Sequence, residues 1–407
     1  MVKTPRVAFF SESFHEVNGV ARTSRAFYSY AQRSGLPFLA VMPGKQPAEI
    51  IEGTAQRWEL PPGALSFAID SDLRFDLAFP RLLPRLRSAL DGFVPDVVHI
   101  TGPGHFGFLG AILAHERRIP LVASWHTNVH EFGARRLEKL LSFLPKALRE
   151  AASGWTERRS LDATLRFYQI ARLLFAPNPE LVSMLEQSTG RPCFLMQRGV
   201  DTELFTPGRR TRSDREFVVG YVGRLSPEKN VRALARLEER LREAGIAEYR
   251  FLIAGQGSER EWLAANLRRA CLPGVLEGAA LAEAYANMDV FVFPSETDTF
   301  GNAVLEAMAS GTPAVVMGKG GPRFLVEQGE SGFVALSDEE LAEAVLKLYH
   351  SPALLDRMRA GARKRAEGRS WDAVFGDVYR HYQAVLPEDA HQSASSGKLR
   401  RPAYVGL

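Results

Sequence analysis

The chain has 407 residues, a formal net charge of +4, and a composition of 45% hydrophobic and 24% charged residues. This length and balance are typical of a globular protein with roughly two to three domains, and they exclude the disordered and fibrous classes. The basic residues are spread along the chain without a long Lys/Arg block, so nucleic acid is not an expected partner.

The cysteines and the apolar runs indicate the cellular compartment in which we expect the protein. Cys193 and Cys271 lie far apart, and neither has a His or Cys at metal-ligand spacing, so we expect neither a zinc site nor a disulfide framework. No stretch approaches the roughly 18 apolar residues of a spanning helix, and the first residues lack the apolar run of a signal peptide. We therefore expect a cytoplasmic protein whose contact with a membrane, where it occurs, is peripheral.

Short β-branched or aromatic runs alternate with longer segments of helical periodicity. In the first half of the chain the expected strands are 6–10, 38–42, 97–100, 121–125 and 173–176. After a polar, basic interval at 208–216, the alternation restarts with expected strands at 217–223, 251–255, 290–294 and 313–318. Such alternation is typical of parallel βαβ units. The sequence therefore predicts an α/β protein with two doubly wound, parallel-sheet domains.

The loops that follow these strands are polar and rich in glycine. In open α/β sheets ligands bind beyond the carboxyl ends of the strands, so several such loops together predict a shared cleft. Gly19, in the loop after the first strand, either allows the backbone to approach a phosphate closely or simply forms a turn. His126 follows the strand at 121–125, and this position favours contact with a ligand over a polar cap on the core.

Two cations follow the strand at 217–223. Arg224 and Lys229 lie in GRLSPEKN, directly before a segment of helical periodicity. Cations at the start of a helix favour a bound anion such as a diphosphate. The alternative is a solvated loop in which Lys229 pairs with Glu228 or with acids of the helix.

Two acids separated by seven residues lie in the segment 295–313. Asp298 belongs to the polar approach and Glu306 to a helical run, with Phe300, Gly301 and Asn302 at the turn between them. Carboxylates accept hydrogen bonds from neighbouring hydroxyls, and the free N–H groups of a helix start favour negative charge. The pattern suits a polyhydroxylated ligand that carries phosphate. The alternative is an amphipathic helix whose Glu306 is merely solvated.

As a set, the segments VNGV, GRLSPEKN, GQGSERE and SETDTFGNAVLEAMA resemble glycosyltransferase family 4, over nearly the whole chain. The resemblance implies the GT-B architecture, in which two Rossmann-like domains face each other across a cleft. Retaining members of the family usually have Glu, seven residues and Glu, with the second acid in LEAMA. Here Asp298 occupies the first position with a shorter side chain.

The resemblance implies roles for the acids and the turn. Glu306 would bind the ribose hydroxyls of the nucleotide. Asp298, together with backbone N–H groups around Phe300, Gly301 and Asn302, would bind the hydroxyls of the donor sugar.

The same resemblance implies roles for the other loops. Arg224 and Lys229 would bind the diphosphate, Gly19 would let its loop approach it, and His126 would lie beside the sugar near the reacting carbon. Arg224, Lys229, Asp298 and His126 are thus the implied catalytic residues. The remaining implied donor-binding residues, in the nucleotide pocket and near the base, are Gly255, Gly257, Glu277 and Gly278.

The variant TDTFGN resembles GDP-mannose-dependent mannosyltransferases, whereas the VNGV, TGPG and WHT loops resemble both mannosyl- and sulfoquinovosyl-type lipid glycosyltransferases. The resemblance implies retaining α-mannosyl transfer from GDP-mannose to a lipid or glycan, without a metal or a cofactor beyond the nucleotide sugar. A UDP-sugar-dependent glucosyl- or sulfoquinovosyltransferase is the first alternative. A nucleotide-sugar epimerase or hydrolase and a non-catalytic sugar-nucleotide binder are alternatives of other classes.

The fold inference sets domain limits. We expect an acceptor-side domain at 1–197 and a nucleotide-sugar-binding domain at 198–369. A helix within 370–387 resembles the segment that crosses back to the first domain in this architecture, and 388–407 has the composition of a flexible tail.

The segment 133–160 combines basic residues with leucines at helical spacing. Such a segment either lies on an anionic membrane, where it would help to deliver a lipid acceptor, or packs on its own domain.

Overall fold

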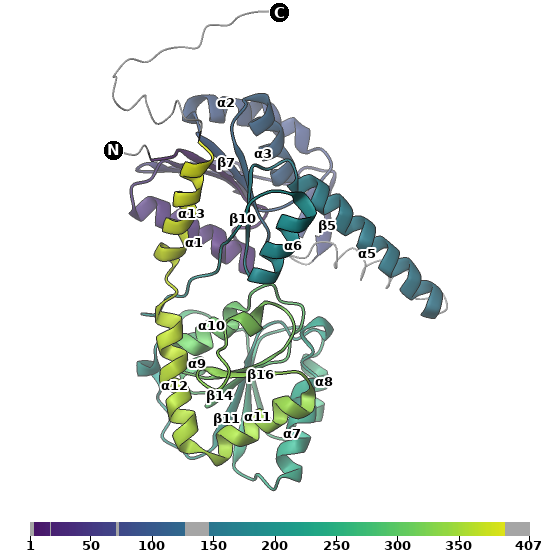
Figure 1. The fold of residues 1–407 in the computed structure, drawn as a ribbon, viewed down its shortest axis with the longest axis vertical. Coiled ribbons are helices and arrows are strands. Elements are labelled where there is room, and N and C mark those ends of the chain that lie inside the picture. The colour runs from purple at the N-terminus through teal and green to yellow at the C-terminus, as the bar shows by residue number, and fades with distance from the viewer. Residues whose placement is uncertain (1–3, 17, 71–72, 127–145, 387–407) are drawn as a thin grey trace, which may run out of the picture. The chain divides into compact units, whose positions relative to one another are not determined.

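The computed structural model describes residues 4–16, 18–70, 73–126 and 146–386. The chain divides into two compact units (Figure 1). The first unit combines Met1–Ala176, Leu181–Phe194 and Phe375–Leu407, and the second combines Pro177–Glu180 and Leu195–Val374. The tail expected at 388–407 lies outside the described residues, as does 133–145 of the basic segment.

The first unit is built on an eight-stranded sheet with the order β10-β9-β8-β7-β1-β2-β4-β3. The central pairings are parallel, whereas β3 runs antiparallel to β4 at the edge. The strands of this sheet are β1 (Val7–Phe10), β2 (Phe38–Pro43), β3 (Ala48–Glu52), β4 (Ala55–Leu60), β7 (Val97–Ile100), β8 (Leu121–Ser124), β9 (Leu173–Ala176) and β10 (Cys193–Leu195). A separate hairpin consists of β5 (Ser66–Asp70) and β6 (Leu73–Asp76).

The helices of the first unit follow from local signals in the chain. For example, α1 (Gly19–Arg33) begins at Gly19 because the side chain of Asn18 accepts a hydrogen bond from the N–H of Ala21, at 2.9 Å. The other helices among the described residues are η1 (Phe79–Leu82), α2 (Leu83–Phe93), α3 (His105–Glu116), α5 (Lys146–Tyr168), α6 (Pro179–Thr189), which begins in the second unit, and α13 (Trp371–Ala384).

The last helix, α13, belongs to the first unit from Phe375 onward. Phe375 stacks on Phe27 of α1, with ring centroids 4.3 Å apart and ring planes 5° apart. Tyr379 and Tyr382 are buried on the same helix. This apolar face accounts for the docking of the helix, because aromatic side chains bury large areas.

The second unit has a six-stranded parallel sheet with the order β13-β12-β11-β14-β15-β16. Its strands are β11 (Phe217–Val222), β12 (Tyr249–Ala254), β13 (Ala270–Gly274), β14 (Val290–Phe293), β15 (Ala314–Met317) and β16 (Gly332–Ala335). Its helices are η2 (Pro207–Arg209), η3 (Pro227–Lys229), α7 (Ala233–Glu243), α8 (Arg260–Asn266), α9 (Gly278–Ala286), α10 (Asn302–Ala309), η4 (Gly321–Phe324), α11 (Asp338–His350) and α12 (Pro352–Glu367). Figure 1 shows α9, α10 and α12 on one side of this sheet and α7, α8 and α11 on the other.

The predicted fold class is confirmed, and every strand expected from the sequence is present. The central strands are buried on both faces, as the continuous apolar runs indicate. The strands that the sequence did not predict are short or partly exposed ones, chiefly at sheet edges. In β3, for example, half-buried and exposed positions alternate and two of the five residues are glutamates, so the run lacks a strong apolar signal.

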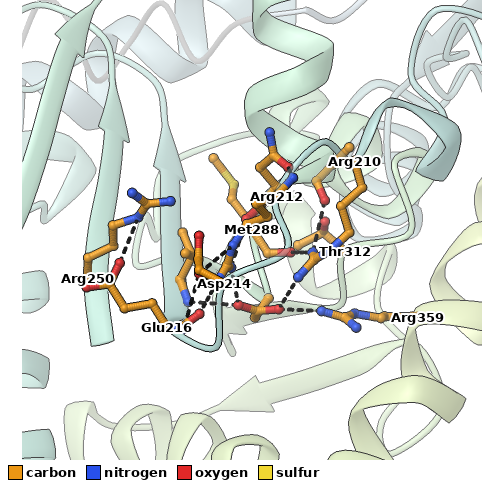
Figure 2. A network of polar contacts seen from close by, with 12 residues as sticks. Arg210, Arg212, Asp214, Glu216, Arg250, Met288, Thr312 and Arg359 are labelled. Atoms are coloured by element: carbon orange, nitrogen blue, oxygen red, sulfur yellow. Dashed lines mark hydrogen bonds and ion pairs between the residues drawn. The ribbon is translucent and has the colours of Figure 1, made fainter. Parts of the chain in front are cut away.

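A network of charged side chains closes the amino end of the second sheet (Figure 2). Asp289, directly before β14, is buried, and its carboxylate pairs with Arg210 at 2.9 Å, with Arg212 at 2.5 Å and with Arg359 of α12. The N–H of Val218 in β11 also donates to this carboxylate, at 2.9 Å. The network therefore fixes the basic interval 208–216 against two strands and a helix.

The described residues include no helix that combines the length and the apolar character needed to cross a bilayer.

Candidate active site

The loops after β11 and β14 meet through an ion pair between two predicted site residues. Lys229 Nζ lies 2.7 Å from Asp298 Oδ1. The hydroxyl of Thr297 also donates to the backbone carbonyl of Glu228, at 3.3 Å. The sequence left Glu228 or a helix acid as the alternative partner of Lys229, and the structure shows Asp298 in that position instead.

The start of α10 carries two acceptor atoms that the protein leaves open. Asp298 Oδ2 and Asn302 Oδ1 are buried, and within the described part of the chain neither has a hydrogen-bond partner. Buried polar atoms are nearly always paired, because an unpaired one costs about 1–3 kcal/mol. Two such atoms close to one helix start therefore indicate a place where a ligand supplies the donors.

Gly301 sets the turn that brings these residues together. Its φ of 99° is left-handed, and a Cβ atom there would lie 3.0 Å from Cγ of Pro322. A residue other than glycine would be strained at this point. The N–H of Gly321 donates to the backbone carbonyl of Asp298 at 2.7 Å, and the buried ring of Phe300 anchors the turn to the core.

Glu306 lies one turn further along α10. Its side chain is only 4% exposed, and Oε2 accepts a hydrogen bond from the hydroxyl of Tyr285 in α9, at 3.0 Å. The alternative interpretation, a solvated acid on an amphipathic helix, is therefore wrong. A buried carboxylate in a fixed orientation is suited to bind hydroxyl groups of a ligand.

Gly255 and Gly257 hold two strand-end loops together. A Cβ atom on Gly255 would lie 1.9 Å from the carbonyl oxygen of Gly223, and one on Gly257 would lie 2.2 Å from that of Leu225. Only glycine permits so close an approach. The contact positions the loop that carries the exposed side chain of Arg224.

Glu277 and Gly278 lie at the amino end of α9. Glu277 occupies the N-cap position, Gly278 is the first residue of the helix, and both are exposed. The same helix carries Tyr285, so these residues are linked to Glu306 through one rigid element.

Gly19 and His126 belong to the first unit, whereas the site residues described above belong to the second. Gly19 is the exposed first residue of α1. His126 follows β8 and is 6% exposed, with Nε2 2.6 Å from Oγ of Ser124. His126 thus lies at the carboxyl edge of its sheet, as predicted, and is held there from within the unit.

Sequence reasoning missed Gly321, which supports the backbone of Asp298. The signal was present, because GKGG directly follows β15, and a glycine-rich strand end is the same pattern that indicated the other loops.

Glu12, two residues after the end of β1, was also missed. Its Oε1 accepts a hydrogen bond from the N–H of Gly107 in α3, at 2.6 Å, and its Oε2 lies 3.6 Å from Nδ1 of His105. Burial raises the pKa of Glu12 to about 8, although hydrogen bonds from the backbone N–H groups of α3 act in the opposite direction. Burial also lowers the pKa of His105 to about 4. The sequence signal was an acid at a strand end, without any indication of its burial.

Comparisons with known proteins bear on the family and the fold of the chain. The family models described as "Glycosyltransferase Family 4" and "Glycosyl transferases group 1" match residues 17–204 and 216–351, respectively. The chain is 34% identical to a GDP-mannose-dependent alpha-mannosyltransferase of Mycolicibacterium smegmatis, over 94% of this chain and 98% of that protein. It is 29% identical to the sulfoquinovosyl transferase SQD2 of Arabidopsis thaliana, over 94% and 74%.

The fold has relatives among solved structures. The structure of HepE from Anabaena in complex with UDP and glucose superimposes with a TM-score of 0.64 at 17% identity, covering 94% of this chain and all of that one. Two doubly wound parallel sheets with this set of strand-end loops define a GT-B glycosyltransferase that acts on nucleotide sugars. The chain belongs to glycosyltransferase family 4, the group 1 glycosyltransferases. The predicted family, fold and enzyme class are thereby confirmed.

Proposed function

We propose that the enzyme transfers an α-mannosyl group, with retention of configuration, from GDP-mannose to a hydroxyl of a lipid or glycan. The observation that carries the proposal is the Lys229–Asp298 ion pair beside the open acceptors Asp298 Oδ2 and Asn302 Oδ1. The name of the Mycolicibacterium smegmatis relative supports mannose and GDP as the donor's parts.

The donor sugar is proposed to bind at the start of α10. Asp298 Oδ2 and Asn302 Oδ1 accept hydrogen bonds from hydroxyls of the sugar, which removes the cost of leaving both atoms unpaired. Lys229 fixes the position of the Asp298 carboxylate through Oδ1. Because Lys229 holds this carboxylate in place, Asp298 is proposed to reach the sugar although its side chain is shorter than the family's usual Glu.

The nucleotide and its diphosphate are proposed to bind next to the sugar. Glu306, oriented by Tyr285, binds the ribose hydroxyls. The exposed side chain of Arg224, the ammonium of Lys229 and the N–H groups at the start of α10 bind the diphosphate. Gly255, Gly257, Glu277 and Gly278 shape the loops of the nucleotide pocket, with the last two near the base.

In the proposed reaction, the bond from the anomeric carbon to the diphosphate oxygen breaks and the bond to the acceptor oxygen forms on the same face. The acceptor proton passes to an oxygen of the departing diphosphate. The main task of the protein is then to stabilise the negative charge of the leaving group, which Arg224 and Lys229 perform. Gly19 and His126, in the first unit, are proposed to contact the diphosphate and the sugar.

A thermal-shift series tests the donor. We expect GDP-mannose to raise the melting temperature more than UDP-glucose, UDP-galactose or UDP-GlcNAc, because a ligand that binds only the folded state stabilises it. Lys229→Ala should lose the shift. Lys319→Ala should keep it, because Lys319 is an exposed lysine after β15 whose ammonium pairs with Glu296, at 3.2 Å, and not with Asp298. A shift with a UDP-sugar alone would contradict the choice of GDP-mannose.

A second candidate is a UDP-sugar-dependent glucosyl- or sulfoquinovosyltransferase, which the similarity to SQD2 favours. The same series separates the two candidates by the nucleobase. An epimerase or hydrolase would consume the donor at the same rate with and without an acceptor, and a non-catalytic binder would show a thermal shift without turnover. Pelleting with anionic liposomes tests the peripheral membrane contact that a lipid acceptor requires.

A further inference from the structure

A continuous row of hydrogen bonds links His126 to the last helix through the interior of the first unit. His126 Nε2 lies 2.6 Å from Oγ of Ser124, and the same oxygen lies 2.9 Å from Nε2 of His99. On its other side, His99 Nδ1 lies 2.5 Å from the hydroxyl of Tyr382 in α13. The four side chains come from three distant parts of the sequence.

The inner members of this row are sealed from solvent. His99 and Tyr382 are both 0% exposed. Burial lowers the pKa of His99 to about 3 and raises that of Tyr382 well above its ordinary value, so both groups are neutral near pH 7. The ring of His99 is packed edge-on against Phe9, with centroids 5.3 Å apart, which restricts its rotation.

The direction of the hydrogen bonds follows from counting donors. Among the described residues, Tyr382 has no acceptor other than His99 Nδ1, so its hydroxyl donates there. A neutral imidazole has one N–H, so the proton of His99 is on Nε2 and is donated to Ser124 Oγ. Ser124 has two acceptors in reach, His126 Nε2 at 2.6 Å and the carbonyl oxygen of Ile100 at 3.5 Å, and the shorter distance favours donation to His126 Nε2. His126 therefore carries its proton on Nδ1.

We propose that Tyr382, His99 and Ser124 are positioning residues that hold His126 in one orientation and in the neutral Nδ1–H tautomer. The inference rests on the proposed contact of His126 with the donor sugar, where a fixed N–H donor would face a sugar oxygen. The proposal gives helix α13 a role in the site, because the hydroxyl of Tyr382 donates to His99 Nδ1 and thereby keeps the proton of His99 on Nε2. The tautomer of a histidine is set by the partner of its other nitrogen.

Tyr382→Phe tests the row, with Tyr379→Phe as a matched control. The hydroxyl of Tyr379 is also buried on α13, but among the described residues it has no hydrogen-bond partner, so its removal leaves the row intact. The readout is the ¹⁵N NMR spectrum of the full-length protein labelled at histidine, in which the signals of His126 are those absent from His126→Asn. Wild type and Tyr379→Phe should show one tautomer, protonated at Nδ1, and Tyr382→Phe a mixture of both.

Ser124→Ala breaks the row next to His126 and should produce the same mixture. A wild-type His126 protonated at Nε2 would overturn the proposal. So would spectra of Tyr382→Phe and Ser124→Ala that match wild type.

Turnover provides the second readout. In Tyr382→Phe we expect kcat with GDP-mannose to fall roughly 10-fold while KM changes less than about twofold, because the row orients a group and binds nothing itself. Equal kcat in Tyr382→Phe and Tyr379→Phe would contradict the role in the reaction. A protein without GDP-mannose turnover would refute the proposed function. The NMR experiment needs no substrate, so the His126 tautomer would still test the row of hydrogen bonds.

Discussion

Two aspartates flank strand β14, and their carboxylates differ in how completely they are paired. Asp289, at the amino end, has two contacts on each carboxylate oxygen: Arg210 and Arg359 on Oδ1, and Arg212 and the N–H of Val218 on Oδ2. A carboxylate enclosed in this way has no capacity left for a ligand. Its role is to hold the chain segments together.

Asp298, beyond the carboxyl end of the same strand, is incompletely paired. Lys229 contacts Oδ1, whereas Oδ2 is buried and has no hydrogen-bond partner within the described residues. Buried charge is tolerated when it is paired, so an oxygen left open implies a further partner. The difference teaches that the completeness of pairing, more than residue type, separates the structural acid from the acid proposed to bind the ligand.

The largest expected effect is on stability, from Asp289→Asn. It removes the charge that compensates three arginines, of which the side chain of Arg212 is only 6% exposed. We expect the free energy of unfolding to fall by about 3–5 kcal/mol. Chemical denaturation measures this, with Asp377→Asn as the control, because its surface pair with Arg380 contributes at most about 1 kcal/mol. Equal losses in the two variants would show that the network contributes little.

The second effect falls on turnover. Asp298→Asn keeps the shape of the side chain and removes its charge, so kcat/KM with GDP-mannose should fall roughly 100-fold while the free energy of unfolding changes by less than about 1 kcal/mol. Initial rates and denaturation curves of the same preparation provide both numbers. A variant that lost stability and kept its turnover would reverse the assignment of the two aspartates.

The sequence predicted the fold, and it indicated candidate site residues but not the contacts between them. Buried central strands such as β1 and β14 have continuous apolar runs, and the rule that ligands bind at strand ends indicated Arg224 and His126. The pairing of Lys229 with Asp298 was not predicted, because it depends on β11 and β14 being neighbours in the sheet. Sequence order alone does not give that neighbourhood.

The interior partners were also beyond sequence reasoning. The contact of His99 with Tyr382 requires the last helix to dock on the first unit, and the burial of Glu12 requires α3 to begin beside β1. Both contacts form only in the tertiary structure, so the sequence around each residue carries no signal of them.

A smaller effect concerns pH and a third buried acid, Glu12. Its pKa in the folded protein is about 8, against an ordinary value of 4.5, so between these values the unfolded chain releases a proton that the folded protein keeps. This contribution to stability is complete below pH 4.5 and is lost as the pH rises through 8, by at most about 1.4 kcal/mol per pH unit. Glu12→Gln should flatten the decline of the melting temperature from pH 6 to pH 8, and Glu49→Gln, an exposed acid, should not. The same slope in all three proteins would contradict the raised pKa.

Buried histidines act in the opposite direction on the acid side. Burial lowers the pKa of His99 to about 3 and that of His105 to about 4, from 6.5. Their contribution is complete above pH 6.5 and is lost as the pH falls toward those values, because the unfolded chain then binds the protons. Together with Glu12, they place the pH of maximum stability between the loss on the acid side and the loss on the alkaline side.

The smallest effect is expected from metal removal. We expect EDTA to change turnover by less than about twofold, because in the proposed site Arg224 and Lys229 supply to the diphosphate the charge that a metal would otherwise supply. A large loss that Mg²⁺ or Mn²⁺ restores would show that the two cations are insufficient.

The most direct test of the open aspartate compares the binding of GDP-mannose and GDP by calorimetry. In wild type, GDP-mannose should bind more tightly than GDP, because the sugar supplies donors to Asp298 Oδ2 and Asn302 Oδ1. In Asp298→Asn that difference should shrink by about tenfold or more, while the affinity for GDP stays close to the wild-type value. An unchanged preference for GDP-mannose in the variant would show that Asp298 does not bind the sugar.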